Sequence, residues 1–367
     1  MHTVAMERYV GLREVALHAG VHHSTVARVL KGNPAISRET TARVKTAIND
    51  LGYQPDPRLS ALAEYRRQRR PPADATVIAW VNIDSVPKDH PDYWFGEAYR
   101  GAQTRASEFG YRIEEFCRRS LGVTLQRLMD IIYARGINGV IFDHPARNRV
   151  HLRLPWERFS MVKFGYEIVH PTLDVIVGHH FHKMRLVFRT LRKLGYKKIG
   201  AFLLPSNDER VNHQWSAAYL WEQQRLPPSQ HIPLAFPSHT AWGEEYFRSW
   251  LKRVKPDAII INKPNPYLDW LKKLRLNIPD DIGVASMYVP SNDRQLSGIN
   301  PHFEDQGRAA VDRLITLLNT NQRGVPRLQT TMLIEPSWQQ GHTAVHCSDE
   351  KAAKKAKLIS PKPKKKP

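Results

Sequence analysis

Hydrogen-bonding side chains gather in one short segment close to the N-terminus. His23, Ser24 and Arg28 can each bond to base edges or to phosphates, and Ala27 lies between them. Apolar residues recur here at helical spacing, so a helix over 23–31 would bury its apolar side and expose these groups. A short helix with such a face has the size and the chemistry to enter the major groove of DNA.

Two further helices are placed to position that segment. Amphipathic stretches at 12–19 and 37–51 flank it, separated from it by glycine-containing turns. Ser37 is expected to cap the third helix and Gly52 to end it. The pattern predicts a helix-turn-helix, in which the first helix braces the second across the DNA backbone. From spacing alone, a plain three-helix bundle with an incidentally polar face is the alternative.

A histidine-rich cluster raises the question of a metal site. His179, His180 and His182 lie close together, and imidazole is a common zinc ligand. Their spacing does not suit a single helical face, and no cysteine or acidic pair accompanies them in the sequence. We therefore expect a solvated turn at these residues and no metal.

The sequence lacks the motifs of the common enzyme classes. It contains no phosphate-binding glycine loop, no Gly-x-Ser-x-Gly elbow and no zincin motif. The carboxylates of Glu114 and Glu115 are adjacent, as are those of Asp280 and Asp281, so each pair would point apart on a strand. We predict no enzymatic activity and no cofactor.

Composition indicates a folded protein of more than one domain. At 367 residues the chain is long enough for two or three domains, and its hydrophobic share of 41% and aromatic share of 9% are those of a globular protein. No apolar run approaches the ~18 residues that cross a bilayer. The first residues lack the apolar segment of a secretion signal, and Cys117 and Cys347 cannot form a disulfide framework. These features predict a cytoplasmic location and no membrane partner.

The charge of the chain points to a polyanionic partner. The formal net charge is +20, and much of the excess lies in the arginines of 66–70 and in the tail at 351–367. Lysine and arginine bind phosphate because condensed counterions are released. The tail has almost nothing to bury and is expected to be disordered, either as a solvated extension or as a non-specific DNA contact.

Beyond the first three helices the pattern changes twice. Asp56 and Pro57 can start a very short fourth helix over 56–63, followed by a polar linker at 66–72. From residue 76, short apolar runs alternate with amphipathic helices, which is typical of parallel sheets with helical crossovers. The expected strands are 77–81, 112–116, 139–142, 159–164, 175–177, 199–203, 258–261 and 282–285. The expected helices are 98–109, 125–134, 183–194, 267–274 and 306–318.

A longer set of positions forms a recognisable pattern. It comprises Val15-Ala16, Gly20-Val21, Thr25-Val26, Arg28-Val29-Leu30, Ser37, Thr40, Arg43-Val44, Leu51-Gly52-Tyr53-Gln54-Pro55 and Leu62-Ala63. Looser matches follow at 136–141, 191–199, 296–299 and 303–314. The pattern resembles the lactose-repressor (LacI/GalR) family of bacterial transcription regulators.

This resemblance implies the fold class and its boundaries. We expect an all-α helix-turn-helix head at 8–53, a hinge helix and linker at 54–73, an α/β two-lobed periplasmic-binding-protein-like effector domain at 74–346, and a basic tail at 347–367. The first lobe would comprise about 74–177 and 301–332, and the second about 178–300 and 333–346. Crossovers are implied near Val177, Pro301 and Leu333, with the ligand between the lobes at the carboxyl ends of the strands.

The resemblance also implies which residues contact DNA. His23 and Ser24 would read bases in the major groove, Thr25 and Arg28 would contact backbone or base, and Leu62 would wedge into the minor groove, where an apolar side chain kinks DNA. His22 and Ala27 depart from the family, because serine is usual at both positions. The full expected set is His22, His23, Ser24, Thr25, Ala27, Arg28, Lys31, Tyr53, Arg58 and Leu62.

The implied effector pocket departs further from the family. Val211 stands where many sugar-binding members have arginine, Tyr288 where an aspartate is usual, and Lys263-Pro264 where an asparagine–aspartate pair is usual. A typical hexose effector is therefore not expected, although aromatic faces could hold a ring and Arg210 or Lys263 an anion. Loss of the effector altogether is the alternative. The expected effector set is Trp94, Phe95, His144, Arg210, Trp215, Lys263 and Tyr288.

Together these features predict a sequence-specific transcription regulator, in the first place a repressor. Its partners would be a pseudo-palindromic operator duplex, a small-molecule effector of the carbohydrate type or a related metabolite, and a second copy of the chain in a homodimer. Its location would be cytoplasmic and associated with the nucleoid. A solute-binding protein without gene control and an effector-independent architectural DNA binder are the alternatives.

Overall fold

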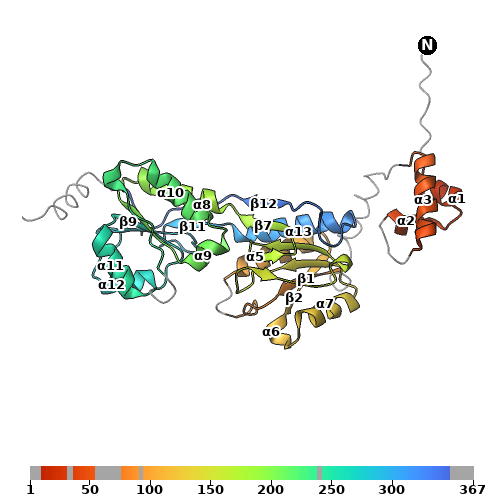
Figure 1. Ribbon diagram of the computed structural model, residues 1–367, viewed down its shortest axis with the longest axis horizontal. Helices are drawn as coiled ribbons and strands as arrows, with labels where there is room; N and C mark the ends of the chain where they lie inside the picture. Colours follow the sequence, from red (N-terminus) through yellow and green to blue (C-terminus); the bar gives the residue numbers. More distant parts are fainter. Residues whose placement is uncertain (1–9, 31–35, 54–75, 91–93, 238–241, 348–367) are drawn as a thin grey trace, which may run out of the picture.

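A computed structural model describes residues 10–30, 36–53, 76–90, 94–237 and 242–347 (Figure 1). It contains a helical head and two α/β lobes. Within these ranges, no helix is both long enough and apolar enough to cross a membrane.

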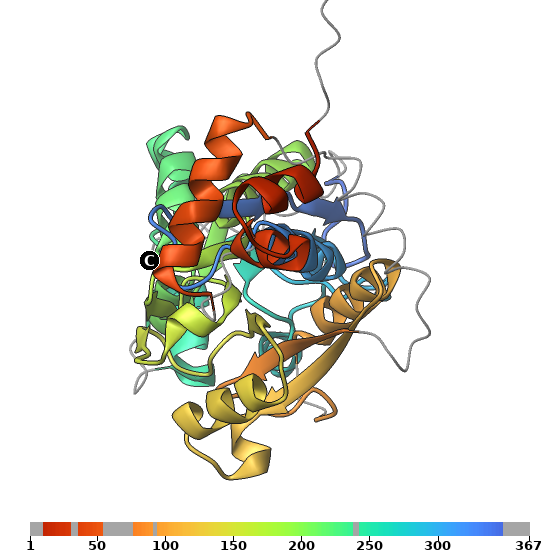
Figure 2. The ribbon, with the colours of Figure 1, turned by 90° about the vertical axis from the view of Figure 1, so that its right-hand side faces the viewer.

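The head consists of α1 (Leu12–His18), α2 (His23–Leu30) and α3 (Arg38–Asp50). Their apolar faces share a small core that includes Val15, Val26 and Val44, each without solvent exposure. Ser37 caps α3 as predicted, because its hydroxyl accepts a hydrogen bond from the Thr40 N–H at 3.2 Å. The three helices face the viewer in Figure 2.

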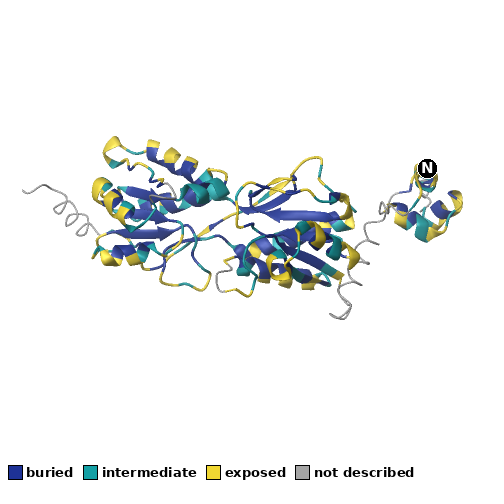
Figure 3. Cartoon of the chain, turned by 60° about the horizontal axis from the view of Figure 1, so that its bottom comes forward, coloured by how far each residue is buried: buried dark blue, intermediate teal, exposed yellow. Residues whose placement is uncertain are grey.

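The first lobe is built on a six-stranded parallel sheet in the order β12-β7-β5-β3-β1-β2. Helices α5 and α13 pack on one face of the sheet and α7 on the other, so the inner strands are buried on both sides (Figure 3). The strands are β1 (Thr76–Asn82), β2 (Tyr111–Cys117), β3 (Gly139–Phe142), β5 (Ser160–Phe164), β7 (Asp174–Gly178) and β12 (Thr331–Ile334). The helices are α5 (Gly96–Glu108), α6 (Arg118–Leu121), α7 (Leu125–Ala134) and α13 (Phe303–Asn319), and β4 (Val150–His151) pairs with β6 (Ile168–His170).

The second lobe has a five-stranded sheet in the order β13-β11-β10-β9-β8, in which only β13 is antiparallel to its neighbour. Helices α8 and α10 cover one face, and α11 and α12 cover the other. The strands are β8 (Ile199–Phe202), β9 (Ala258–Ile261), β10 (Gly283–Ser286), β11 (Gly298–Asn300) and β13 (Ser337–Gln339). The helices are α8 (His180–Lys193), α9 (Pro205–Arg210), α10 (Gln214–Gln224), α11 (Glu244–Val254) and α12 (Tyr267–Lys273).

The chain passes between the two lobes three times. It leaves the first sheet after β7, returns between β11 and α13, and leaves again between β12 and β13. Because all strands of the first sheet are parallel, the residues that follow β3, β5 and β7 emerge at the same edge, next to the second lobe. This edge is called the lobe boundary below.

Several elements differ from those predicted. Helices α9, α10 and α11 and strands β11, β12 and β13 are absent from the predicted set, and α8 begins at His180 instead of residue 183. The expected solvated turn at His180 and His182 is wrong, because both residues lie in the first turn of α8. The predicted fourth helix at 56–63 lies outside the described residues.

Candidate functional sites

The polar side of α2 faces outward. His22, His23 and Arg28 are exposed, and Ser24, Thr25 and Ala27 are half-buried. The other side of the helix packs on α1 and α3 through Val26 and Val29, which are buried. The helix therefore presents hydrogen-bonding groups of several kinds on a surface that nothing in the described head covers.

His22 caps the start of α2. Its carbonyl accepts the first bonds of the helix, from the N–H groups of Thr25 at 2.8 Å and Val26 at 3.3 Å. Its Nδ1 lies 2.8 Å from the Ser24 hydroxyl and accepts from the Ser24 N–H at 3.4 Å. The imidazole thus partners a free N–H at the start of α2.

Arg43 on α3 locks the turn between the first two helices. Its guanidinium donates to the carbonyls of Ala19 at 2.6 Å and Gly20 at 3.2 Å. Gly20 has a φ of +62°, and a side chain there would meet the Arg43 Nη2 at 3.1 Å, so glycine suits both the backbone and the contact. Arg43 fixes the angle between the helices and was not among the residues singled out for function.

The remaining predicted DNA contacts fall into two groups. Tyr53 is only 7% exposed and packs in the core of the head, so the structure gives its ring a packing role. Lys31, Arg58 and Leu62 lie outside the described residues.

A charged cluster occupies the lobe boundary. Glu167 follows β5, is 2% exposed, and accepts from His144 Nδ1 at 2.9 Å and from Arg210 Nη1 at 2.9 Å. Burial would raise the pKa of Glu167, but the His144 imidazole and the Arg210 guanidinium outweigh it and hold the pKa below its usual value. Gly165 leaves room for this pair, because a Cβ there would lie 2.2 Å from a Glu167 oxygen. His144 and Arg210 were predicted, whereas Glu167 was not.

Arg210 ties the two lobes together. From α9 in the second lobe it donates to the carbonyls of Pro145 at 2.9 Å and Ala146 at 2.6 Å in the first lobe. Asn148 in the same first-lobe loop donates back to the Ser206 carbonyl at 2.8 Å. Arg210 is therefore already engaged by protein oxygens and is not a free group for an anion.

The predicted aromatic residues are only partly brought together. Trp94 is 46% exposed, and its ring lies 5.0 Å from His144 and 5.4 Å from Phe303. Tyr288, from the second lobe, lies 5.3 Å from the same Phe303. Phe95 is fully buried in the core of the first lobe, where it packs beneath these rings and is not accessible to a ligand.

Trp215 and Lys263 complete the predicted effector set. Trp215 is buried, with its ring 5.8 Å from that of His180 at the lobe boundary. Lys263 is exposed after β9. Among the described residues, no hydrogen bond or ion pair joins Lys263 to the rest of the set.

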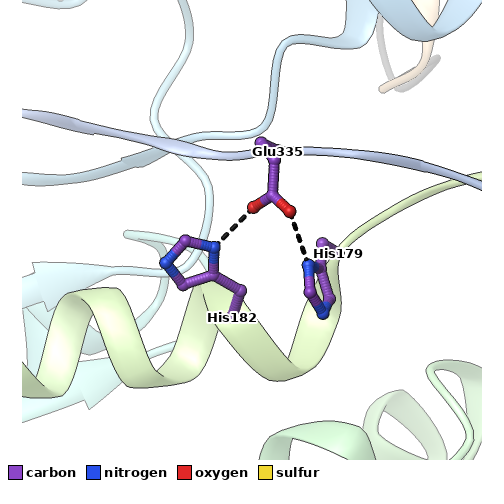
Figure 4. Close-up of side chains that lie close together, drawn as sticks. All are labelled: His179, His182 and Glu335. Carbon is purple, nitrogen blue, oxygen red and sulfur yellow. Dashed lines mark hydrogen bonds and ion pairs between the residues drawn. The ribbon is translucent and has the colours of Figure 1, made fainter.

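His179, His182 and Glu335 meet at the first and third passages between the lobes (Figure 4). The two Nδ1 atoms lie 2.8 Å and 2.5 Å from the two Glu335 oxygens. These bonds lower the pKa of the Glu335 carboxyl. No acidic pair accompanies these histidines in the sequence, but the fold brings Glu335 to them from a distant segment. Ligand atoms of these types can hold a divalent metal, and here they already satisfy one another as a clasp.

Comparison with known proteins agrees with the head and the lobes. Residues 11–56 match the model of "Bacterial regulatory proteins, lacI family", and residues 188–343 match "Periplasmic binding protein-like domain". The regulator MalR of Streptococcus pneumoniae is 30% identical over 133 residues, which are 36% of this chain and 38% of MalR. The repressor MelR of Bacillus subtilis is 24% identical over 353 residues, covering 89% of this chain and 97% of MelR.

A solved structure shares the fold over most of the chain. The lac repressor dimer bound to operator and the anti-inducer ONPF matches with a TM-score of 0.53 and 16% identity, covering 92% of this chain and 100% of that one. The helix-turn-helix head and the two α/β lobes define a DNA-binding transcription regulator. Residues 11–56 belong to the lacI family of bacterial regulatory proteins, a family of regulators and not of enzymes.

Proposed function

We propose that this protein binds a pseudo-palindromic operator as a homodimer and represses transcription. The outward polar face of α2 carries the proposal, because it has the donors and acceptors that read a major groove and is held rigidly by α1 and α3. We assign base and phosphate contacts to His22, His23, Ser24, Thr25, Ala27 and Arg28. Lys31 and Arg58 are assigned to phosphates and Leu62 to the minor groove, by family resemblance.

We further propose that a small molecule at the lobe boundary controls operator affinity. The charged and aromatic groups there come from both lobes, so a ligand that bonds to both favours one lobe arrangement over another. The proposed division is a head at 8–53, a hinge and linker at 54–73, the two lobes at 74–346 and a tail at 347–367. A cytoplasmic location at the nucleoid follows from this role.

Selection of binding sites from genomic DNA with the full chain tests the operator proposal. We expect enrichment of a dyad motif, with affinity that falls steeply as salt rises, because several phosphates are neutralised per protomer. Enrichment of no dyad would instead favour a solute-binding role. Deleting residues 351–367 should leave the sequence preference unchanged, which would exclude an architectural binder that depends on its basic tail.

Arg28→Ala tests the assigned surface directly. We expect a loss of about 10- to 100-fold in operator affinity, the usual size for an arginine that contacts a base edge. Arg253→Ala is the matched control, because Arg253 is an exposed arginine on α11 of the second lobe and the change in net charge is the same. Fluorescence anisotropy with the selected operator measures both, and an equal loss in the two variants would contradict the role of α2.

A further inference from the structure

Hydrogen-bonding atoms without a partner are concentrated at the lobe boundary. Within the described ranges, seven buried side-chain nitrogen or oxygen atoms lack a hydrogen-bond partner. Four of them are in residues of this boundary: Asn148 Oδ1, Glu167 Oε2, His180 Nδ1 and Trp215 Nε1. A buried polar atom left unpaired costs about 1–3 kcal/mol, so such a concentration indicates a place where another molecule supplies the missing partners.

Lys183 adds an uncompensated charge to the same place. It lies near the start of α8 and is 4% exposed, and its ammonium makes no hydrogen bond or ion pair with any described residue. Burial lowers the pKa of its ammonium to about 8. A buried cation is costly unless an anion or a set of acceptors accompanies it. By contrast, the buried charges of Glu167 and Lys163 in the same neighbourhood do have protein partners.

The position of Lys183 is that of a ligand-binding group. A Cβ built on Gly178, the last residue of β7, would lie 3.9 Å from Lys183 Nζ, 4.0 Å from His180 Cε1 and 3.5 Å from Gln306 Nε2. These side chains thus surround the carboxyl end of a parallel strand, where open α/β sheets bind ligands. The first turn of α8 contains no acidic residue, and the positive end of its helix dipole favours an anion there.

The Lys183 position is continuous with the rest of the boundary. The His180 ring lies 5.8 Å from that of Trp215 and 6.4 Å from that of Tyr166. Tyr166 directly precedes Glu167, whose unpaired oxygen accepts hydrogen bonds and cannot donate them. One side of the boundary therefore offers a cation and an N–H donor, and the other side offers an acceptor.

We propose that the effector is an anion whose carboxylate or phosphate binds the Lys183 ammonium and the Trp215 N–H, and whose hydroxyl groups donate to Glu167. This inference deepens the proposed effector function and rests on it. The chemical class is a small polyhydroxylated acid or sugar phosphate, in contrast to a neutral sugar. Lys183 and Trp215 are binding residues in this proposal, and Arg210 and His144 hold Glu167 in place.

Matched pairs of small molecules test the charge requirement. The probes are glucuronate, gluconate and glucose 6-phosphate, with glucose and sorbitol as neutral partners, each added to the full chain in a thermal-shift assay and followed by calorimetric titration. A ligand that binds only the folded protein raises its melting temperature. We expect at least one anion to do so and its neutral partner to have no effect at the same concentration. Comparison of glucuronate and gluconate with glucose 6-phosphate shows whether the site prefers a carboxylate or a phosphate.

Two variants with matched controls locate the site. Lys183→Met removes the charge with little change in length and should weaken binding of the anion at least tenfold. Lys193→Met, at an exposed position of the same helix, should leave that affinity unchanged. Trp215→Phe keeps an aromatic ring but removes the N–H and should weaken binding severalfold. Trp250→Phe is its control, because Trp250 also has an unpaired N–H but packs in the core on the far face of the second sheet.

The outcomes separate this inference from the operator proposal. The anion site is overturned if no anion of the panel stabilises the wild type, if neutral partners stabilise it equally, or if Lys183→Met leaves the anion's effect intact. Operator binding by ligand-free Lys183→Met, measured in parallel, should equal that of the wild type. If the wild type enriched no dyad motif, the operator proposal would be refuted, but the result on anion binding would be unaffected.

Discussion

At the scale of single residues, the cost of burying Lys183 should be visible in the pH dependence of stability. Its folded-state pKa of about 8 lies below the ordinary 10.5. Between these values the unfolded chain binds a proton that the folded protein has lost, so the free energy of unfolding rises with pH in this window. Below pH 8 both states are charged, and folding carries the full penalty, at most about 3 kcal/mol by the usual conversion.

Lys183→Met should therefore be more stable than the wild type at pH 7, and its advantage should shrink as the pH rises from 8 to 10. Urea denaturation at several pH values measures this difference. The pKa of Lys163 is likewise lowered to about 8 by burial. Because Lys163 is present in both proteins, its effect on the free energy of unfolding is the same in each. If the difference in free energy of unfolding between Lys183→Met and the wild type stayed constant across the pH range, burial of the ammonium would carry no such penalty.

At the scale of elements, the start of α2 depends on an imidazole. His22 accepts from the Ser24 N–H, and loss of a cap costs a helix about 1 kcal/mol. His22→Ala should accelerate amide hydrogen exchange in α2 about fivefold, the change that corresponds to this free energy. His22→Ser, which restores a hydroxyl cap, should exchange as the wild type does. Equal exchange in all three proteins would mean that packing on α1 and α3 alone determines the helix.

At the scale of the whole molecule, the lobes are joined by contacts as well as by the chain. Arg210 bonds to Pro145, Ala146 and Glu167 across the boundary, and the clasp of His179, His182 and Glu335 connects two of the three passages. Removing Arg210 leaves the buried Glu167 carboxylate with His144 as its remaining charged partner, which favours separation of the lobes.

Arg210→Ala should thus increase the radius of gyration of the ligand-free protein in solution X-ray scattering and lower its melting temperature. Arg225→Ala is the control, because Arg225 is exposed at the end of α10. Scattering curves that coincide for wild type and Arg210→Ala would show that the three chain passages alone hold the lobes.

Elements with a regular apolar pattern could be predicted from the sequence. The bounds of α7 and of β3 and β9 coincide with those expected, because each is a continuous or strictly periodic apolar run. Helix α10 has no such pattern, since it buries Ser216, Glu222 and Gln223 beside its aromatic residues. Helix α11 could have been predicted, because its buried residues Phe247, Trp250 and Leu251 lie at helical spacing.

The sequence by itself determined the outward face of α2, because a helix with one apolar stripe can pack in only one way on its neighbours. It could also have indicated Lys183, a charged residue in line with the apolar Val187 and Leu191 of α8. Only the tertiary structure decided what surrounds that residue. Glu167, Arg210 and Glu335 meet their partners through contacts between separate strands and lobes, and no local pattern encodes which strand ends will adjoin.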